Sequence, residues 1–129
     1  MNKPEVIYTY TRQEAIADGE QTCISDLYPS DCRVFKYPIY FTRKVMSLLE
    51  NSNDPGGVVW DICCMAVRSP SRVKLNESTC KFSLIIQNAE IKPDFIEDGC
   101  PCYTLIAQVG ATDFDDPAPA VTVMFPDEM

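Results

Sequence analysis

The chain has 129 residues, of which 46% are hydrophobic and 23% are charged, and its formal net charge is −8. This composition is typical of a folded protein rather than a disordered one, and the length predicts a single domain over residues 1–129. There is no apolar run of the roughly 18 residues that a membrane-spanning helix needs, and the opening sequence MNKPEVIYTY lacks the apolar core of a secretory signal. We therefore expect a cytoplasmic protein without a membrane partner.

The first predicted elements are a strand and a short helix. Side chains in the segment 5–10 alternate as they do in a short strand. Thr11 follows as a helix N-cap, and Glu14 stands three residues later, where a capping box needs it. Gly19 can adopt the left-handed conformation that ends a helix. Together these signals predict a helix over 12–18.

The next stretch contains a second helix after an irregular segment. Residues 24–32 offer a helix cap but meet Pro29 almost at once, so we predict a turn or irregular structure. Residues 38–41 are predicted to be extended, and Thr42 to cap a helix. One face of that helix carries apolar side chains at helical spacing: Val45, Leu48 and Leu49. The sequence SNDPGG then ends it.

The stretch 58–68 is apolar almost all round for three turns, which predicts a buried central helix that stops before Pro70. The side chains that we expect in the core are Trp60, Ile62, Met65 and Ala66.

Three later segments alternate apolar and polar residues with the period of a strand. Their apolar faces are Phe82, Leu84 and Ile86 in the first, Tyr103, Leu105, Ala107 and Val109 in the second, and Val121, Val123 and Phe125 in the third. Successive strands joined by turn-rich loops predict an antiparallel meander. The predicted fold class is α+β, with two layers: a meander of about three to four strands packed against about two to three helices.

The seven cysteines are predicted to be free thiols, because their number is odd and a reducing compartment is expected. A cysteine-only zinc site is the minor alternative. Its ligands would come from Cys63, Cys64, Cys100 and Cys102. Neighbouring helical residues point about 100° apart, and the usual pairs of cysteines two residues apart are absent, so the spacing disfavours this site.

Catalytic signatures are absent from the sequence. The chain has no histidine, no glycine-rich phosphate loop and no recognisable nucleophile motif. The stretch GATDFDDPAP fails as a calcium loop, because the sixth position counted from Asp113 is Ala118 and the twelfth is Met124, where glycine and glutamate are required. We therefore expect no enzyme, no cofactor and no metal, and a metal-dependent enzyme is the least favoured reading.

The net charge is concentrated in the last third of the chain. Residues 1–87 carry ten acidic and ten basic side chains, whereas residues 88–129 carry nine acidic ones and Lys92 alone. An acidic flank excludes direct nucleic-acid binding and favours a basic protein partner, or else serves only solubility. The predicted partner-binding residues are Asp94, Glu97, Asp98, Asp113, Asp115, Asp116, Asp127 and Glu128. The sequence leaves open whether they gather, since the 110–119 connection and the 88–99 connection can lie at opposite ends of the sheet.

Four stretches carry a family resemblance. They are YTRQEAIADG at 10–19, YPIYFT at 37–42, the pair Trp60-Asp61, and VTVMFP at 121–126. With them, the chain resembles a family of small proteins of unknown function that phages, plasmids and other mobile elements encode, whose N-terminal motif is YTRxxAIxDG. The resemblance covers most of the chain, but the 20–35 region and the cysteines depart from the family pattern.

The resemblance implies a setting rather than an activity, because no catalytic or binding residue carries over from it. It implies an accessory protein of a mobile element in the bacterial cytoplasm, where small acidic proteins frequently inhibit host defence. The leading hypothesis is an anti-CRISPR-like inhibitor that mimics nucleic acid and occupies a basic, nucleic-acid-binding surface of an effector. The alternative is a non-enzymatic interaction or regulatory module of a phage or plasmid replication or transfer system.

Overall fold

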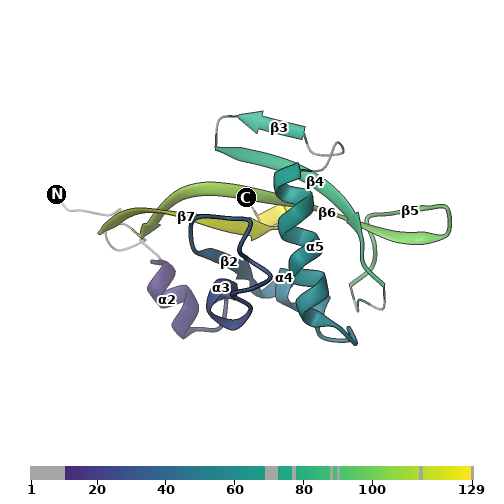
Figure 1. The fold of residues 1–129 in the computed structure, drawn as a ribbon, viewed down its shortest axis with the longest axis horizontal. Helices are drawn as coiled ribbons and strands as arrows, with labels where there is room; N and C mark the ends of the chain where they lie inside the picture. Colours follow the sequence, from purple (N-terminus) through teal and green to yellow (C-terminus); the bar gives the residue numbers. More distant parts are fainter. Residues whose placement is uncertain are drawn as a thin grey trace.

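The computed structural model describes residues 11–68, 73–76, 78–87, 89, 91–113 and 115–128. They form an α+β structure in which helices pack against a mixed seven-stranded sheet (Figure 1). The strand predicted at 5–10 lies outside the described residues. None of the described helices is long and apolar enough to cross a bilayer.

The described part of the chain contains more elements than the three to four strands and two to three helices predicted. In chain order these are α2 (Arg12–Ala17), β1 (Gln21–Cys23), α3 (Ile24–Leu27), β2 (Ile39–Thr42), α4 (Arg43–Met46), the 3-10 helix η1 (Ser47–Leu49), α5 (Pro55–Arg68), β3 (Val73–Asn76), β4 (Thr79–Ile85), β5 (Phe95–Glu97), β6 (Cys100–Asp113), β7 (Asp116–Met124) and the 3-10 helix η2 (Pro126–Glu128).

The strand order is β1-β2-β7-β6-β4-β3, and β5 pairs with the beginning of β6. The predicted antiparallel meander is confirmed as β4-β6-β7. Beside it, β2 runs parallel to β7, with Ile39 opposite Val121 and Phe41 opposite Val123. The short strands β1, β2, β3 and β5 extend the meander at its margins. The extended segment predicted at 38–41 is confirmed as β2, whereas β1, β3 and β5, at three or four residues, gave too little alternation to predict.

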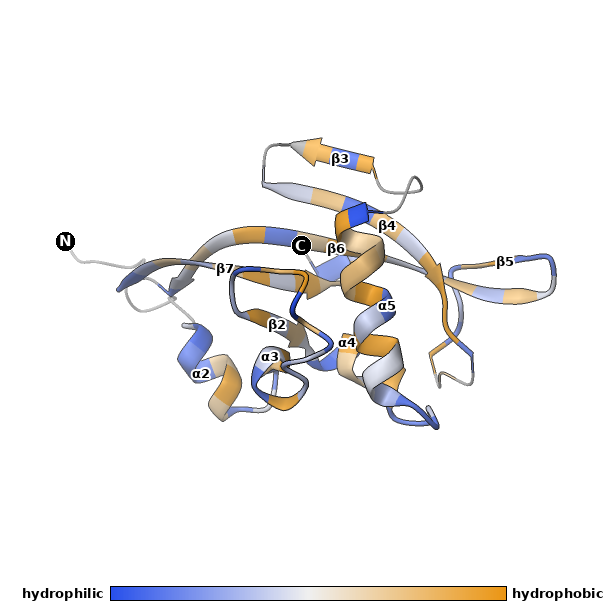
Figure 2. Ribbon diagram, viewed as in Figure 1, coloured by the Kyte–Doolittle hydropathy of each residue, from blue (hydrophilic) through white to orange (hydrophobic). Residues whose placement is uncertain are grey.

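The core lies between α5 and the apolar face of the meander (Figure 2). The predicted faces of β4 and β7 are buried, as are Tyr103, Leu105 and Ala107 of β6, whereas Val109 is 39% exposed. From α5, the buried side chains are Val59, Ile62, Cys63 and Ala66. Two predicted core residues of α5 are only partly buried, Trp60 and Met65, and Met65 packs against the core from its margin. Trp60 faces the segment between α3 and β2, where the Arg33 guanidinium lies 4.7 Å from its ring centre.

The helix α2 confirms the prediction made from its caps. The Glu14 backbone N–H donates to the Thr11 hydroxyl at 3.0 Å, and the Thr11 N–H donates back to the Glu14 carboxylate at 3.1 Å. Gly19 has a φ of 78°, the left-handed conformation expected past the helix end. Thr42 likewise caps α4, since the Val45 N–H donates to its hydroxyl at 3.4 Å.

The prediction of irregular structure at 24–32 was wrong for its first four residues, which form the single helical turn α3. Long-range packing explains the difference. Ile24 is completely buried in the core, and the Ser25 hydroxyl accepts a hydrogen bond from the Ile39 N–H at 3.2 Å. The turn ends at Tyr28, directly before Pro29, as a proline requires.

The 110–119 stretch, predicted to be a loop, is mostly strand, because β6 continues to Asp113 and β7 resumes at Asp116. Two prolines, Pro117 and Pro119, are tolerated there for a geometric reason. The Val121 N–H points toward β2, where it donates to the Pro38 carbonyl at 2.9 Å. Pro119, two positions earlier, has its nitrogen on the same side, where no described strand pairs, so its missing N–H leaves no hydrogen bond unmade. Pro117 lies where the register of β6 and β7 shifts, between the Ala111–Pro119 and Asp113–Asp116 pairs, and such irregular positions tolerate proline.

Candidate functional site

The predicted acidic contact residues fall into three separate places. Asp94, Glu97 and Asp98 lie around the β5–β6 turn, residues 97–100. Asp113, Asp115 and Asp116 form the β6–β7 tip, residues 113–116, at the opposite end of the long strand β6 (Figure 1). Asp127 and Glu128 belong to the C-terminal turn η2. The fold therefore does not gather these charges into one surface.

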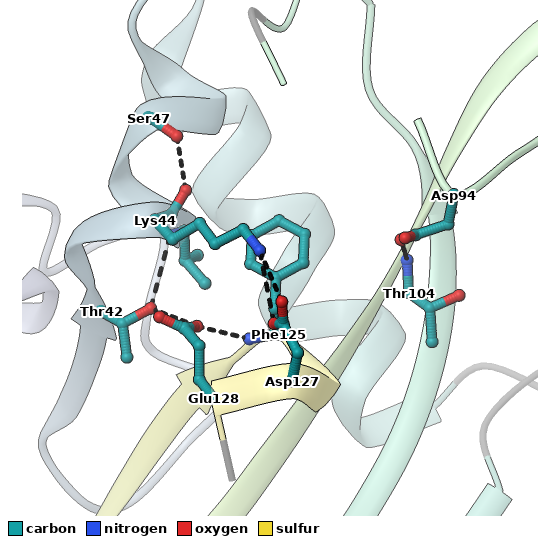
Figure 3. Close-up of polar contacts among 9 residues, drawn as sticks. Thr42, Lys44, Ser47, Asp94, Thr104, Phe125, Asp127 and Glu128 are labelled. Atoms are coloured by element: carbon teal, nitrogen blue, oxygen red, sulfur yellow. Dashed lines mark hydrogen bonds and ion pairs between the residues drawn. The ribbon is translucent and has the colours of Figure 1, made fainter. Parts of the chain in front are cut away.

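The two acids of η2 tie this turn to the beginning of α4 (Figure 3). Asp127 forms an ion pair with Lys44 at 3.0 Å. Glu128 accepts hydrogen bonds from the Thr42 hydroxyl at 2.9 Å and from the Phe125 N–H at 2.7 Å. The Lys44 ammonium also lies 4.6 Å from the centre of the Phe125 ring. Both carboxylates thus have partners inside the protein.

A polar cavity of about 540 Å³ opens next to this cluster, between α2, β1 and α4. Its walls carry Arg43 and Glu20, which form an ion pair at 3.2 Å with both side chains largely exposed. Lys44 and Glu128 also reach this cavity, and both are engaged in the contacts just described. Apart from the exposed Glu50, the charged side chains of this cavity are already paired with one another or with neighbours, and none is buried, which weakens it as a binding site.

At the β5–β6 turn, Asp94 also has a structural role. Its carboxylate accepts from the Thr104 N–H at 2.7 Å, and its own N–H donates to the Cys102 carbonyl at 2.9 Å (Figure 3). Asp98 and Gly99 have φ values of 52° and 78°, the pair of left-handed residues that a tight hairpin turn needs. Aspartate tolerates this conformation better than most residues, so the turn explains Asp98. Glu97 is exposed.

At the β6–β7 tip, Asp113 forms a second cap on α2. Its two carboxylate oxygens accept from the backbone N–H groups of Arg12 at 3.3 Å and Gln13 at 3.1 Å. The Arg12 guanidinium donates to the Thr112 carbonyl at 2.7 Å and stacks 4.1 Å from the Tyr40 ring. Partial burial lowers the pKa of Arg12 below its ordinary value, while nearby Tyr40 and Asp113 oppose this.

The remaining tip residues are exposed. The Asp116 carboxylate accepts from the Ala118 N–H at 3.1 Å, a local bond that stabilises the turn. Among the described residues, Asp115 has no hydrogen-bond or ion-pair partner. Every residue from 115 to 119 is exposed, and the sequence contains no Lys or Arg after Lys92. The negative charge of the tip therefore faces solvent without a neutralising side chain on its own strands.

All seven cysteines are free, as predicted. Cys32 and Cys63 are buried neighbours: a hydrogen bond from the Cys63 thiol lowers the pKa of Cys32, and this pairing together with burial raises the pKa of Cys63. Within the described ranges, no three His, Cys, Asp or Glu side chains lie close enough to hold a metal ion. The four cysteines considered for zinc form no such group.

Sequence reasoning missed a mainly apolar cavity of about 400 Å³. It lies between the segment 34–37, the end of α5, and strands β4, β6 and β7. Among the residues that the structure describes, its lining contains Lys36 and Lys74 and no acidic residue. The lining comes from segments far apart in the chain, so no local pattern could have indicated it. The one sequence signal is Val109, an apolar residue that continues the alternation of the apolar face of β6. In the structure its side chain stays partly exposed.

No family model matches this sequence, and no curated protein and no solved structure is significantly similar to it. What the molecule does has to be inferred from its own surfaces.

Proposed function

We propose that this is a non-enzymatic binding protein that docks the β6–β7 tip onto a basic surface of another protein. The observation that carries the proposal is the exposure of Asp115 and Asp116 at the end of a two-stranded ribbon. Charges placed at the end of a projecting ribbon reach a concave basic surface before the rest of the molecule does. Such charges act mainly on the association rate and on specificity.

The ribbon is held in place, which suits a contact surface. Asp113 accepts from two N–H groups at the N-terminal end of α2, and the Arg12 guanidinium of the same helix end donates to the Thr112 carbonyl. Ordering the tip in advance lowers the entropy that binding must overcome. Pro117 and Pro119 stand in the part of β7 beside which no described strand pairs, and a proline there disfavours the pairing of another strand. Recognition would therefore proceed through side-chain charge and not through strand addition.

The partner that we propose is a nucleic-acid-binding effector of a bacterial host defence system, in the cytoplasm. This part of the proposal is supported by the family resemblance and by the net charge of −8. A basic groove that normally holds a phosphate backbone would accept an acidic ribbon in its place. A replication or transfer protein of a phage or plasmid is the second candidate partner, because it would present the same kind of surface.

The proposed contact surface is narrower than the eight residues predicted from the sequence. Asp94, Asp127 and Glu128 have partners inside the protein, so we place them outside it. Glu97 and Asp98 lie at the opposite end of β6 from the tip. They cannot reach the same small surface as Asp115 and Asp116.

A matched pair of variants tests the proposal. The tip variant is Asp115→Lys with Asp116→Asn, where asparagine keeps the oxygen that accepts from Ala118. The control variant is Glu97→Lys with Asp98→Asn, where asparagine tolerates the positive φ of position 98. Both change the net charge by the same amount at opposite ends of β6. Wild type and both variants are immobilised, and bacterial lysate proteins are captured and identified by mass at low and high salt.

We expect wild type and the control variant to retain the same nucleic-acid-binding protein, and the tip variant to lose it at low salt. At high salt all three should retain little, because the Debye length falls from about 10 Å at 0.1 M to about 3 Å at 1 M. Equal recovery by the two variants would show that only overall charge matters. Recovery lost only in the control variant would move the contact surface to the β5–β6 turn.

A further inference from the structure

The cavity beside the end of α5 has the properties of a ligand site, independently of the acidic tip. Its volume of about 400 Å³ lies within the range of roughly 300–1,000 Å³ usual for small-molecule pockets. We infer that it binds a small molecule with an apolar body and a carboxylate group. No catalytic step is part of this inference, since the cavity would hold its ligand unchanged.

The inner part of the cavity is apolar. Ala107 and Val121 contribute buried side chains of the sheet, and Ala66 contributes a buried residue of α5. Val34 and Phe35 close the cavity from the segment before β2. Apolar walls of this kind bind an alkyl chain or a ring by removing it from water.

The charged residues of the cavity lining that the structure describes are both lysines. Lys36 and Lys74 line it from two different segments, and both side chains are exposed, so their ammonium groups can reach its mouth. Neither forms an ion pair with a carboxylate in the described part of the chain. Two unpaired lysines at one opening are notable in a protein of net charge −8, and they favour an anion.

The polar groups at the mouth favour a carboxylate over a phosphate. Besides the two ammonium groups, Tyr37 brings a hydroxyl to the lining, which can donate to a carboxylate oxygen. A phosphate site commonly adds a row of backbone N–H groups, a helix N-terminus or an arginine fork. The described part of the lining has no arginine, and it is the C-terminal end of α5 that reaches the cavity. Since most of the lining is apolar, the carboxylate should be carried by an apolar body.

Octanoate is a suitable probe because it combines a carboxylate with a short alkyl chain, and 1-octanol is its uncharged counterpart. Calorimetric titration of the full chain should show saturable octanoate binding and weaker 1-octanol binding. Lys36→Met with Lys74→Met should weaken octanoate binding by about five- to tenfold and leave 1-octanol binding unchanged. The charge-matched control is Lys81→Met with Lys92→Met, two exposed lysines outside the cavity lining, which should bind octanoate like wild type.

A cavity-filling variant gives a second measurement. Val109 lines the cavity and is partly exposed, so Val109→Trp can place its ring inside without disturbing the buried core. It should abolish binding of both probes at an unchanged melting temperature. The inference is overturned if wild type binds no octanoate in the millimolar range, if the Lys36/Lys74 variant binds it as tightly as wild type, or if the control weakens binding equally. Because the acidic tip is untouched in every variant, these outcomes are independent of the proposed docking surface.

Discussion

The two ends of β6 both carry exposed acidic residues, yet they use them differently. At the β5–β6 turn, Asp98 adopts the left-handed conformation that the hairpin requires, and Asp94 binds the Thr104 N–H. At the β6–β7 tip, Asp113 binds the end of α2, but Asp115 projects into solvent. The number of acidic residues alone would not distinguish the two ends. What separates them is what the engaged carboxylate binds: Asp94 accepts from one N–H of the adjacent strand β6, whereas Asp113 accepts from two N–H groups of α2 and so ties its end to that helix.

An acidic stretch can therefore serve as a contact surface mainly through the carboxylates that have no hydrogen-bond partner inside the protein. A carboxylate that already accepts two backbone N–H groups is costly to redirect toward a partner. The predictions below therefore test the structural side chains at each end against the exposed ones.

The largest effect is expected from Asp113→Ala. Two N–H groups at the start of α2 lose their acceptor, and the free energy of unfolding should fall by about 2 kcal/mol, near the upper limit for a lost helix cap. Glu97→Ala, at the other end of β6, should change it by less than about 0.5 kcal/mol. Urea denaturation measures both. If the two variants lost the same free energy of unfolding, the hydrogen bonds of Asp113 would not stabilise the protein and the two ends of β6 would be equivalent.

A glycine pair contrasts the turn with the strand. Gly99 has a φ of 78°, so Gly99→Ala should lower stability by roughly 1–2 kcal/mol through left-handed strain. Gly110 lies in β6 near the tip, without a positive φ and with open space around an added Cβ, so Gly110→Ala should be neutral or stabilise by about 0.5 kcal/mol. Thermal denaturation of the two proteins should give melting temperatures that move in different directions. A Gly99→Ala protein as stable as wild type would contradict the left-handed conformation of the turn.

The local cap of α2 separates helix stability from the tip. Thr11→Ala removes one half of the capping box and should lower the free energy of unfolding by about 1 kcal/mol. Capture of a partner should be unaffected, because the YTRQEAIADG motif is explained by its caps. A folded Thr11→Ala protein that no longer captured the partner would make the motif, and not the tip, the binding site.

No effect is expected from metal removal. Cys100 and Cys102 lie at the β5–β6 end, and zinc bound there would make this end the functional one. A chelator should leave the melting temperature unchanged, and thiol titration of the unfolded protein should count all seven cysteines. A large drop in melting temperature on chelation would reverse the assignment of roles to the two ends.

Local signals in the sequence were sufficient for α2 and for the three alternating strands. Thr11, Glu14 and Gly19 define a helix within nine residues, and β4, β6 and β7 bury the faces that their alternation indicated. The same local rules failed at 110–119, where prolines argue against a strand. Only the position of Pro119 beside no described strand and of Pro117 at a register shift makes the strand possible, and both are properties of the assembled sheet.

The candidate sites depended even more on distant contacts. Asp113 and Gln13 are 100 residues apart, so the sequence could not show that one acid of the DFDD stretch was already engaged. The lining of the apolar cavity combines Lys36 with Lys74 and with Val121 of the last strand. Such encounters follow from the sheet order, in particular from the parallel β2–β7 pair, and this order was not predictable from strands three or four residues long.

The place of β7 in the sheet sets the order in which the chain can fold during synthesis. β7 leaves the ribosome after the other six described strands, yet it lies between β2 and β6. Until β7 emerges, Phe41 of β2 and Leu105 of β6 lack the strand that lies between β2 and β6 and completes the core. Protein synthesis adds about 5–20 residues per second, so the nascent chain spends seconds with these surfaces open to chaperones. A chain cut before residue 116 should yield no partly folded domain, only a substrate for proteolysis.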